Sequence, residues 1–120
     1  METGVNEIIL PWPPSVNRYW RMFQNRMIIS REGRNFRARV MEHVLLQKAF
    51  TRYEGKIKVT IEAWRPDNRR RDLDNLLKAT LDGCTHAGVW TDDSNIVDLR
   101  IYWSKEKAGI LKLKIEEANE

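Results

Sequence analysis

The chain has 120 residues, 42% of them hydrophobic, and carries 21 basic against 17 acidic side chains, a formal net charge of +4. This length predicts one domain over residues 1–120, and the lone cysteine, Cys84, excludes an internal disulfide framework and a cysteine-based zinc site. No apolar run approaches the ~20 residues that span a bilayer, and the first residues do not resemble a secretory signal, so we expect a cytoplasmic protein without a membrane segment.

The amino-terminal half carries most of the positive charge. Residues 1–52 hold nine basic and four acidic side chains, a balance of +5, whereas the remainder is close to neutral at −1. Such an excess on one part of a chain is the electrostatic footprint expected for binding a polyanion.

In chain order, a short strand is expected over residues 5–10, ended by three prolines. The segment 11–21 cannot be regular at its start and is expected to form a rigid loop with aromatic and arginine side chains. Residues 27–29 predict another short strand, and Ser30 is a suitable N-cap for a helix over about 31–53. The predicted apolar face of this helix consists of Phe36, Val40, His43, Gln47 and Phe50, with Arg34, Arg37 and Arg39 mostly elsewhere.

Alternating residues over 57–64 predict a strand that ends before Pro66. Apolar side chains then recur at helical spacing from Leu73 to Cys84, which predicts a helix that packs on the sheet and ends at Gly88.

Residues 96–103 and 110–115 alternate again, and the Lys-rich turn between them predicts an antiparallel hairpin. The order of strands and helices predicts an α/β fold with α+β-like character: a single compact domain with a small mixed sheet and two main helices.

The segment richest in chemistry sets a basic run beside several acids. Arginines bind phosphate, whereas carboxylates repel it unless a hard divalent cation lies between them. Two carboxylates about 4 Å apart repel each other by roughly 4 kcal/mol at an effective dielectric of 20. The grouping therefore predicts metal-dependent chemistry on a phosphodiester backbone. It comprises Arg69, Arg70, Arg71, Asp72, Asp74, Lys78, Asp92 and Asp93.

Asp72 and Asp74 can converge only if a helix begins near Asp74 while Asp72 still belongs to the incoming loop, since positions i and i+2 of a helix do not face each other. Lys78 then lies on the same helix edge as Asp74, and Asp93 follows 19 residues after Asp74, enough for the chain to return towards the sheet. The alternative is that one aspartate caps the helix and that Asp74 and Lys78 form an ordinary surface pair.

The remaining ionisable residues give weaker indications. Asp92 could share metal binding with Asp93 or support the turn. Asp82 is interpreted as part of the solvated face of its helix, and Asp98 as structural. Neither histidine has a neighbour at ligand spacing, which disfavours zinc chemistry and a histidine nucleophile. No glycine-rich phosphate loop is present, so no nucleotide cofactor is expected.

Three segments together resemble the RusA family of Holliday junction resolvases, the crossover junction endodeoxyribonucleases of bacteria, prophages and phages. They are Leu-Pro-Trp-Pro-Pro-Ser-Val-Asn-Arg at 10–18, Arg-Arg-Asp-Leu-Asp-Asn-Leu-Leu-Lys at 70–78 and Gly-Val-Trp-Thr-Asp-Asp at 88–93. The resemblance spans nearly the whole chain, and Thr91 departs from it, where the family pattern has an apolar residue. It implies a homodimeric α/β nuclease that binds four-way DNA junctions and needs Mg²⁺, with Mn²⁺ as a substitute.

The resemblance also places the family's catalytic and metal-binding acids on Asp72, Asp74 and Asp93, and its catalytic lysine on Lys78. For DNA contacts, the basic run Arg69, Arg70 and Arg71 is the first choice, followed by Arg18 and Arg21; the alternative is a solvated loop. The aromatic side chains Trp12, Tyr19 and Trp20 either stack on unpaired bases or belong to the core or the dimer interface.

We therefore expect a magnesium-dependent endonuclease that resolves four-way junctions by paired symmetric nicks during recombination and repair, in a bacterial cell and encoded by the cell, a prophage or a phage. The alternatives are a less selective nuclease for branched or flapped DNA and a module that binds junctions without cutting. The base preference at the cut, the number of metals per site, and whether Lys78 serves its own subunit or its partner stay open.

Overall fold

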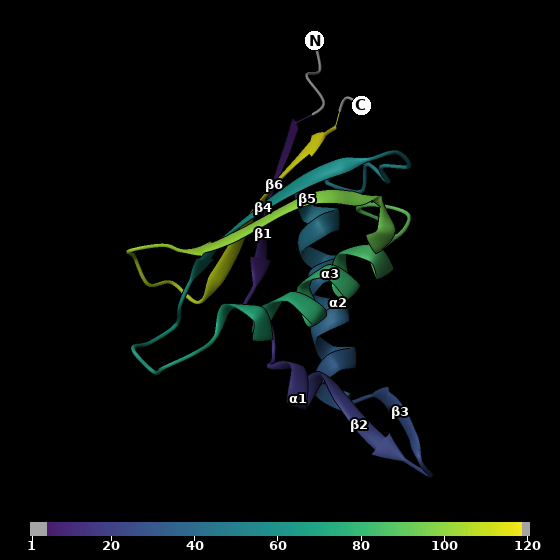
Figure 1. The fold of residues 1–120 in the computed structure, drawn as a ribbon, viewed down its shortest axis with the longest axis vertical. Coiled ribbons are helices and arrows are strands. Elements are labelled where there is room, and N and C mark those ends of the chain that lie inside the picture. The colour runs from purple at the N-terminus through teal and green to yellow at the C-terminus, as the bar shows by residue number, and fades with distance from the viewer. Residues whose placement is uncertain (1–4, 119–120) are drawn as a thin grey trace.

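A four-stranded mixed sheet forms the centre of the fold (Figure 1). The computed structural model describes residues 5–118. Strand β4 pairs in parallel with β5 and antiparallel with β6, which in turn pairs antiparallel with β1. The strands are β1 (Val5–Pro11), β4 (Ile57–Trp64), β5 (Ile96–Trp103) and β6 (Ile110–Glu117), in the order β1-β6-β4-β5.

The predicted alternation along the strands corresponds to a sheet with one packed face and one open face. Along β4, the odd-numbered side chains from Ile57 to Ala63 are buried, and Lys58 on the other face is exposed. Helices α2 (Arg31–Leu46) and α3 (Leu77–His86) cover the packed face (Figure 1). The mixed α/β fold and the small mixed sheet are confirmed, and a third, short helix, α1 (Val16–Tyr19), was not predicted.

Helix α2 begins as predicted, because the Ser30 side chain accepts a hydrogen bond from the Gly33 amide at 3.0 Å. It ends seven residues earlier than expected, at Leu46, since Lys48 has a left-handed φ of 56°. The predicted apolar face is correct for Phe36 and Val40. It is wrong further on: His43 and Gln47 contact the Ile9 carbonyl by hydrogen bonds of 2.9 and 2.7 Å, and Phe50 is exposed.

Helix α3 follows a 3-10 turn, η1 (Leu73–Leu76), and packs closely on α2. Gly83 makes the close packing possible: a Cβ atom there would lie 3.2 Å from Phe36 and 3.3 Å from Val40. The predicted helix end at Gly88 is confirmed, with a left-handed φ of 83° just after the last turn.

The predicted hairpin between β5 and β6 is wrong. Strand β5 pairs with one edge of β4 after the βαβ crossover through α3, so β6 takes the other edge. The connection passes the end of β4, where the Ser104 amide donates to the Ala63 carbonyl and the Ala108 amide to the Arg65 carbonyl. An alternating pattern predicts that a segment is a strand but not which strand it pairs with. The short connection between β5 and β6 only has to cross β4, a distance of ~10 Å across the sheet.

The loop expected over 11–21 is irregular only up to Ser15. Strand β2 (Trp20–Phe23) was not predicted, and it pairs with β3 (Arg26–Ile29) in a separate two-stranded hairpin. The turn residues Gln24 and Asn25 both have positive φ values, 50° and 63°, as in the two-residue turns that suit hairpins. Figure 1 shows this hairpin projecting from the rest of the chain.

No helix within residues 5–118 is long and apolar enough to cross a membrane. Residues 1–4, on which the expected lack of a secretory signal partly depends, lie outside the described residues.

Candidate active site

Asp72 and Asp74 lie where the chain enters helix α3. Asp72 has an extended backbone, with φ −100° and ψ 136°, and helical geometry begins at Leu73. This is the condition under which the two side chains can point to the same place. Both are exposed, and neither carboxylate has a hydrogen-bond or ion-pair partner in the described part of the chain. The capping alternative is thus wrong for Asp72, and both acids are available for a ligand.

The three arginines before these acids do not neutralise them. Instead, Arg71 Nη1 lies 2.8 Å from Asp67 Oδ1, and Arg69 Nε lies 3.5 Å from Asp67 Oδ2. The hydrogen bonds from the Arg71 side chain and the Arg69 backbone lower the pKa of Asp67 to about 2. Sequence reasoning missed Asp67, although an Asp directly after a Pro at the end of a strand is a common turn signal. Asp67 shapes the basic loop and leaves Asp72 and Asp74 without a counter-charge.

A shallow cleft of about 230 Å³ joins this loop to the proline-rich segment near the amino terminus. Trp12 forms part of its wall, stacked on Trp103 with ring centroids 6.4 Å apart and with the Arg71 guanidinium 5.7 Å from its own ring centroid. Two of the sequence motifs therefore meet in space, and Trp12 has a packing role. The cleft is lined by Trp12, Pro13, Ser15, Arg70, Arg71, Asp72, Asn75 and Leu76.

Lys78 lies in the first turn of α3, on the same side of the molecule as the base of the β2–β3 hairpin. Its Nζ atom is 5.7 Å from the centroid of the Trp20 ring, which packs edge-on against Tyr19. Within residues 5–118 no carboxylate pairs with Lys78, so the alternative of an Asp74–Lys78 surface pair is wrong. The ammonium group is therefore available to a bound anion.

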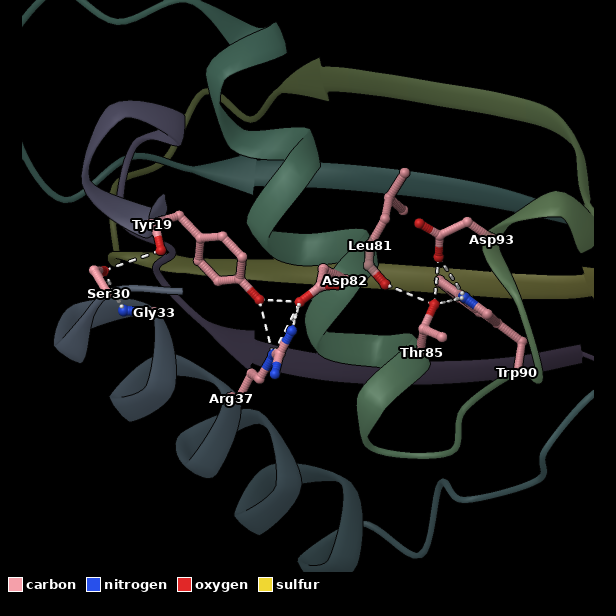
Figure 2. A network of polar contacts seen from close by, with 9 residues as sticks. All are labelled: Tyr19, Ser30, Gly33, Arg37, Leu81, Asp82, Thr85, Trp90 and Asp93. Atoms are coloured by element: carbon pink, nitrogen blue, oxygen red, sulfur yellow. Dashed lines mark hydrogen bonds and ion pairs between the residues drawn. The ribbon is translucent and has the colours of Figure 1, made fainter. Parts of the chain in front are cut away.

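Asp93 lies at the other end of α3. Its Oδ1 accepts hydrogen bonds from the Thr85 hydroxyl, in the last turn of the helix, and from Trp90 Nε1 at 3.1 Å (Figure 2). A ten-residue helix is ~15 Å long, so Asp93 does not join Asp72 and Asp74 within one chain. In agreement, no group of three or more His, Cys, Asp or Glu side chains in the described residues could hold a metal ion.

The topology explains why the expected convergence of the three acids is wrong for a single chain. Strand β5 runs parallel to β4, and Ile96 is beside Ile57, so the segment before β5 must lie at the start of both strands. Asp72, in contrast, follows the end of β4. One oxygen of Asp93 is nevertheless held by the buried Trp90 and by Thr85, while the other has no partner in the described chain.

Asp92 supports a turn. Its carboxylate accepts a hydrogen bond from the Ser94 hydroxyl at 2.7 Å, and its carbonyl accepts one from the Asn95 amide at 3.0 Å. Asp98 is exposed on the edge strand β5.

Asp82 belongs to a half-buried network that joins α1, α2 and α3. Its Oδ2 accepts hydrogen bonds from the Tyr19 hydroxyl and from Arg37, whose Nη2 is 2.8 Å away (Figure 2). Burial, reinforced by the bond to Asp82, raises the pKa of Tyr19 far above its ordinary value, so the phenol stays protonated. The expectation that Asp82 lies on the solvated face of its helix is therefore wrong, and Arg37 is not on an exposed basic face as predicted.

The two further arginines predicted to contact DNA lie on the surface near the hairpin. Arg18 is exposed and has Nε 3.3 Å from Glu32 Oε1, a surface pair that stabilises little. Arg21 is exposed on β2, with its guanidinium 5.3 Å from the Phe23 ring centroid.

Comparison with known proteins adds to this geometry. The family model for endodeoxyribonuclease RusA matches residues 11–116. The chain belongs to the RusA family. Proteins named crossover junction endodeoxyribonuclease RusA from Escherichia coli K12 and Shigella sonnei are each 44% identical to it, and that of Enterobacteria phage 82 is 45% identical. Each alignment covers 92% of this chain and 92% of the relative.

The RusA-family segment matched here contains all four candidate catalytic residues, Asp72, Asp74, Lys78 and Asp93. The chemistry of the donors fits a hard divalent cation, because Mg²⁺ in proteins is bound by one or two carboxylates together with water and phosphate oxygens. Asp72 and Asp74 offer two exposed carboxylates without other partners, beside a basic loop that can bind the phosphate.

Proposed function

We propose that this protein is a magnesium-dependent endonuclease that resolves four-way DNA junctions by paired symmetric nicks in recombination and repair. The observation that carries the proposal is the pair of free carboxylates, Asp72 and Asp74, beside a basic loop in a chain of the RusA family. Phosphate binding alone would not favour free acids at this position, since carboxylates repel phosphate. A module that binds junctions without cutting is therefore the weaker alternative.

In this proposal, Asp72 and Asp74 hold Mg²⁺, or Mn²⁺ in its place. When bound there, such an ion would lower the pKa of a coordinated water and offset the charge of the phosphate. Arg69 and Arg70, exposed on the loop that Asp67 shapes, bind the DNA backbone on either side of the cut. The ammonium of Lys78 donates hydrogen bonds to the phosphate oxygens as negative charge develops on them.

A homodimer suits this reaction, because two symmetric strands require two active sites, which a two-fold dimer supplies. Helix α3 separates Asp93 from Asp72 and Asp74 in one chain. We therefore propose that each active site is shared: Asp72 and Asp74 come from one protomer, and Asp93 of the partner subunit completes the set. Thr85 and Trp90 hold one carboxylate oxygen of Asp93, and the other oxygen has no partner among the described residues.

Mixed dimers of Asp74→Asn and Asp93→Asn test the shared site. Both homodimers are expected to be inactive. If the sites are shared, a mixed dimer has one site with both substitutions and one site with neither, so it should nick one strand of the junction. The measurement is single-strand nicking by differently tagged, co-purified dimers. If each site were built from one chain, both sites would carry a substitution, and the mixed dimer would be as inactive as its parents.

The test of the function itself is cleavage of a labelled mobile four-way junction, with and without Mg²⁺, beside a flap and a linear duplex of the same sequence. We expect paired, symmetric and ligatable nicks in the junction alone, and only with the metal. Equal cutting of the flap would favour the less selective nuclease. Binding without cutting in any divalent metal would favour the binding module and overturn the proposal.

A further inference from the structure

The β2–β3 hairpin extends away from the sheet and carries large exposed side chains. Neither of its strands joins the central sheet, and Figure 1 shows its tip as the most distant point of that end of the molecule. Met22, Phe23 and Met27 are 59, 50 and 61% exposed. Apolar side chains of this size on a projecting element indicate a binding surface.

The two faces of the hairpin differ in chemistry. Residues directly opposite each other in an antiparallel pair share a face. Met22 is opposite Met27, and Phe23 is opposite Arg26. The second face thus presents an aromatic ring with Arg26 beside it and the Arg21 guanidinium 5.3 Å from the ring centroid. An aromatic ring flanked by arginines suits an unpaired base and its neighbouring phosphates.

The charge around the hairpin favours DNA over a second copy of the chain. Between Glu7 and Glu32 there is no acidic side chain, while four arginines are present. Two such hairpins in contact would place arginines against arginines, whereas a polyanion neutralises them. The arginines in this stretch are Arg18, Arg21, Arg26 and Arg31.

The base of the hairpin is fixed beside the candidate active site. The Ser30 amide donates to the Tyr19 carbonyl at 2.9 Å and closes the hairpin, and Tyr19 is anchored to Asp82 (Figure 2). Trp20, the first residue of β2, lies against Lys78. The hairpin is therefore attached through hydrogen bonds beside the candidate catalytic lysine and has a basic and aromatic tip that projects from the sheet.

We propose that the β2–β3 hairpin contacts the branch point of the DNA junction, with Phe23 stacked on an unpaired base and with Arg21 and Arg26 on the adjacent phosphates. This inference rests on the proposed function and adds a second DNA-contacting element to the loop at Arg69–Arg71. Stacking on an aromatic ring is tolerant of base identity. The hairpin would thus select for branched structure, where unpaired bases are accessible, and not for sequence.

Phe23→Ala tests the inference, with Phe50→Ala as the matched control, since Phe50 is equally exposed, at 53%, but follows the far end of α2. Junction affinity is measured by fluorescence anisotropy without divalent metal, and base unstacking by 2-aminopurine at the branch point. Phe23→Ala should weaken junction binding roughly 5- to 100-fold and reduce the 2-aminopurine signal, while affinity for linear duplex stays the same. Phe23→Trp should keep junction affinity and the 2-aminopurine signal close to those of the wild type, and Phe50→Ala should change neither.

Unchanged junction affinity in Phe23→Ala, or an equal loss on duplex and junction, would overturn the inference. So would a shift to monomer in sedimentation velocity, which would make the hairpin a subunit interface. The outcome is separable from that of the proposed function. If the wild type binds junctions without cutting and Phe23→Ala still weakens that binding, only cleavage fails; if the wild type cuts and Phe23→Ala binds like it, only the hairpin inference fails.

Discussion

Asp74→Asn is expected to reduce cleavage of a four-way junction by at least about 100-fold, since even residues that only support metal ligands contribute 10- to 100-fold. The substitution keeps the size of the side chain but removes a negative charge from the candidate metal site. Junction binding should stay as strong as in the wild type or become stronger, because one carboxylate no longer repels phosphate. Single-turnover cleavage and gel-shift affinity, measured on the same junction, check the two halves of this expectation.

The control is Asp98→Asn, an identical change of charge on the exposed edge strand β5, which should leave cleavage as it is. Full activity in Asp74→Asn would contradict the assignment of the metal site. Denaturant unfolding gives a second readout: without metal, Asp74→Asn should be as stable as the wild type or more so, because repulsion within the acid pair is relieved. A capping role would instead cost about 0.5–2 kcal/mol.

Arg37→Met is expected to lower the free energy of unfolding by about 2–3 kcal/mol. Arg37 donates two hydrogen bonds to Asp82 and one to the Tyr19 hydroxyl, and the Arg37 and Asp82 side chains are only 25 and 26% exposed. Met keeps much of the apolar stem but leaves the Asp82 carboxylate without its cation in a partly desolvated position. The expected loss of about 2–3 kcal/mol is smaller than the cost of breaking a fully buried ion pair, because water still reaches both the guanidinium and the carboxylate.

Arg39→Met on the same helix is the matched control, because Arg39 is exposed and the change should stay within ~0.5 kcal/mol. Urea-induced unfolding of the two variants, analysed with the same m-value, gives both free energies of unfolding. Equal stability of the two variants would show that the three-residue network contributes nothing to holding α1 on α3.

The parts of the fold that the sequence predicted are those set by local chemistry. The bounds of β4 and β5 follow from alternation alone, and the start of α2 from the Ser30 cap. What could not be predicted depends on which strand lies beside which. Alternation is the same for a strand in a hairpin and a strand at an edge, so the partner of β5 was assigned wrongly. Strand β2 was missed because its turn, Gln24-Asn25, has no glycine.

The same division holds in the candidate site. The positions of Asp72 and Asp74 at a helix start followed from their spacing, and the structure has them there. The place of Asp93 depends on the parallel pairing of β5 with β4, which no local pattern encodes, and its role comes only from the family resemblance. The link between Arg37 and Asp82 joins residues 45 positions apart and has no signature in the sequence.

The length of helix α3 has a consequence for a subunit on its own. Because the helix keeps Asp93 away from Asp72 and Asp74, a lone copy would carry the basic loop and the hairpin but an incomplete set of acids. If the proposed DNA contacts and the shared site are correct, a lone copy would bind DNA without cutting it. In the shared-site arrangement, cleavage would rise steeply as dimers form with increasing protein concentration, and newly made or diluted chains would not cut DNA.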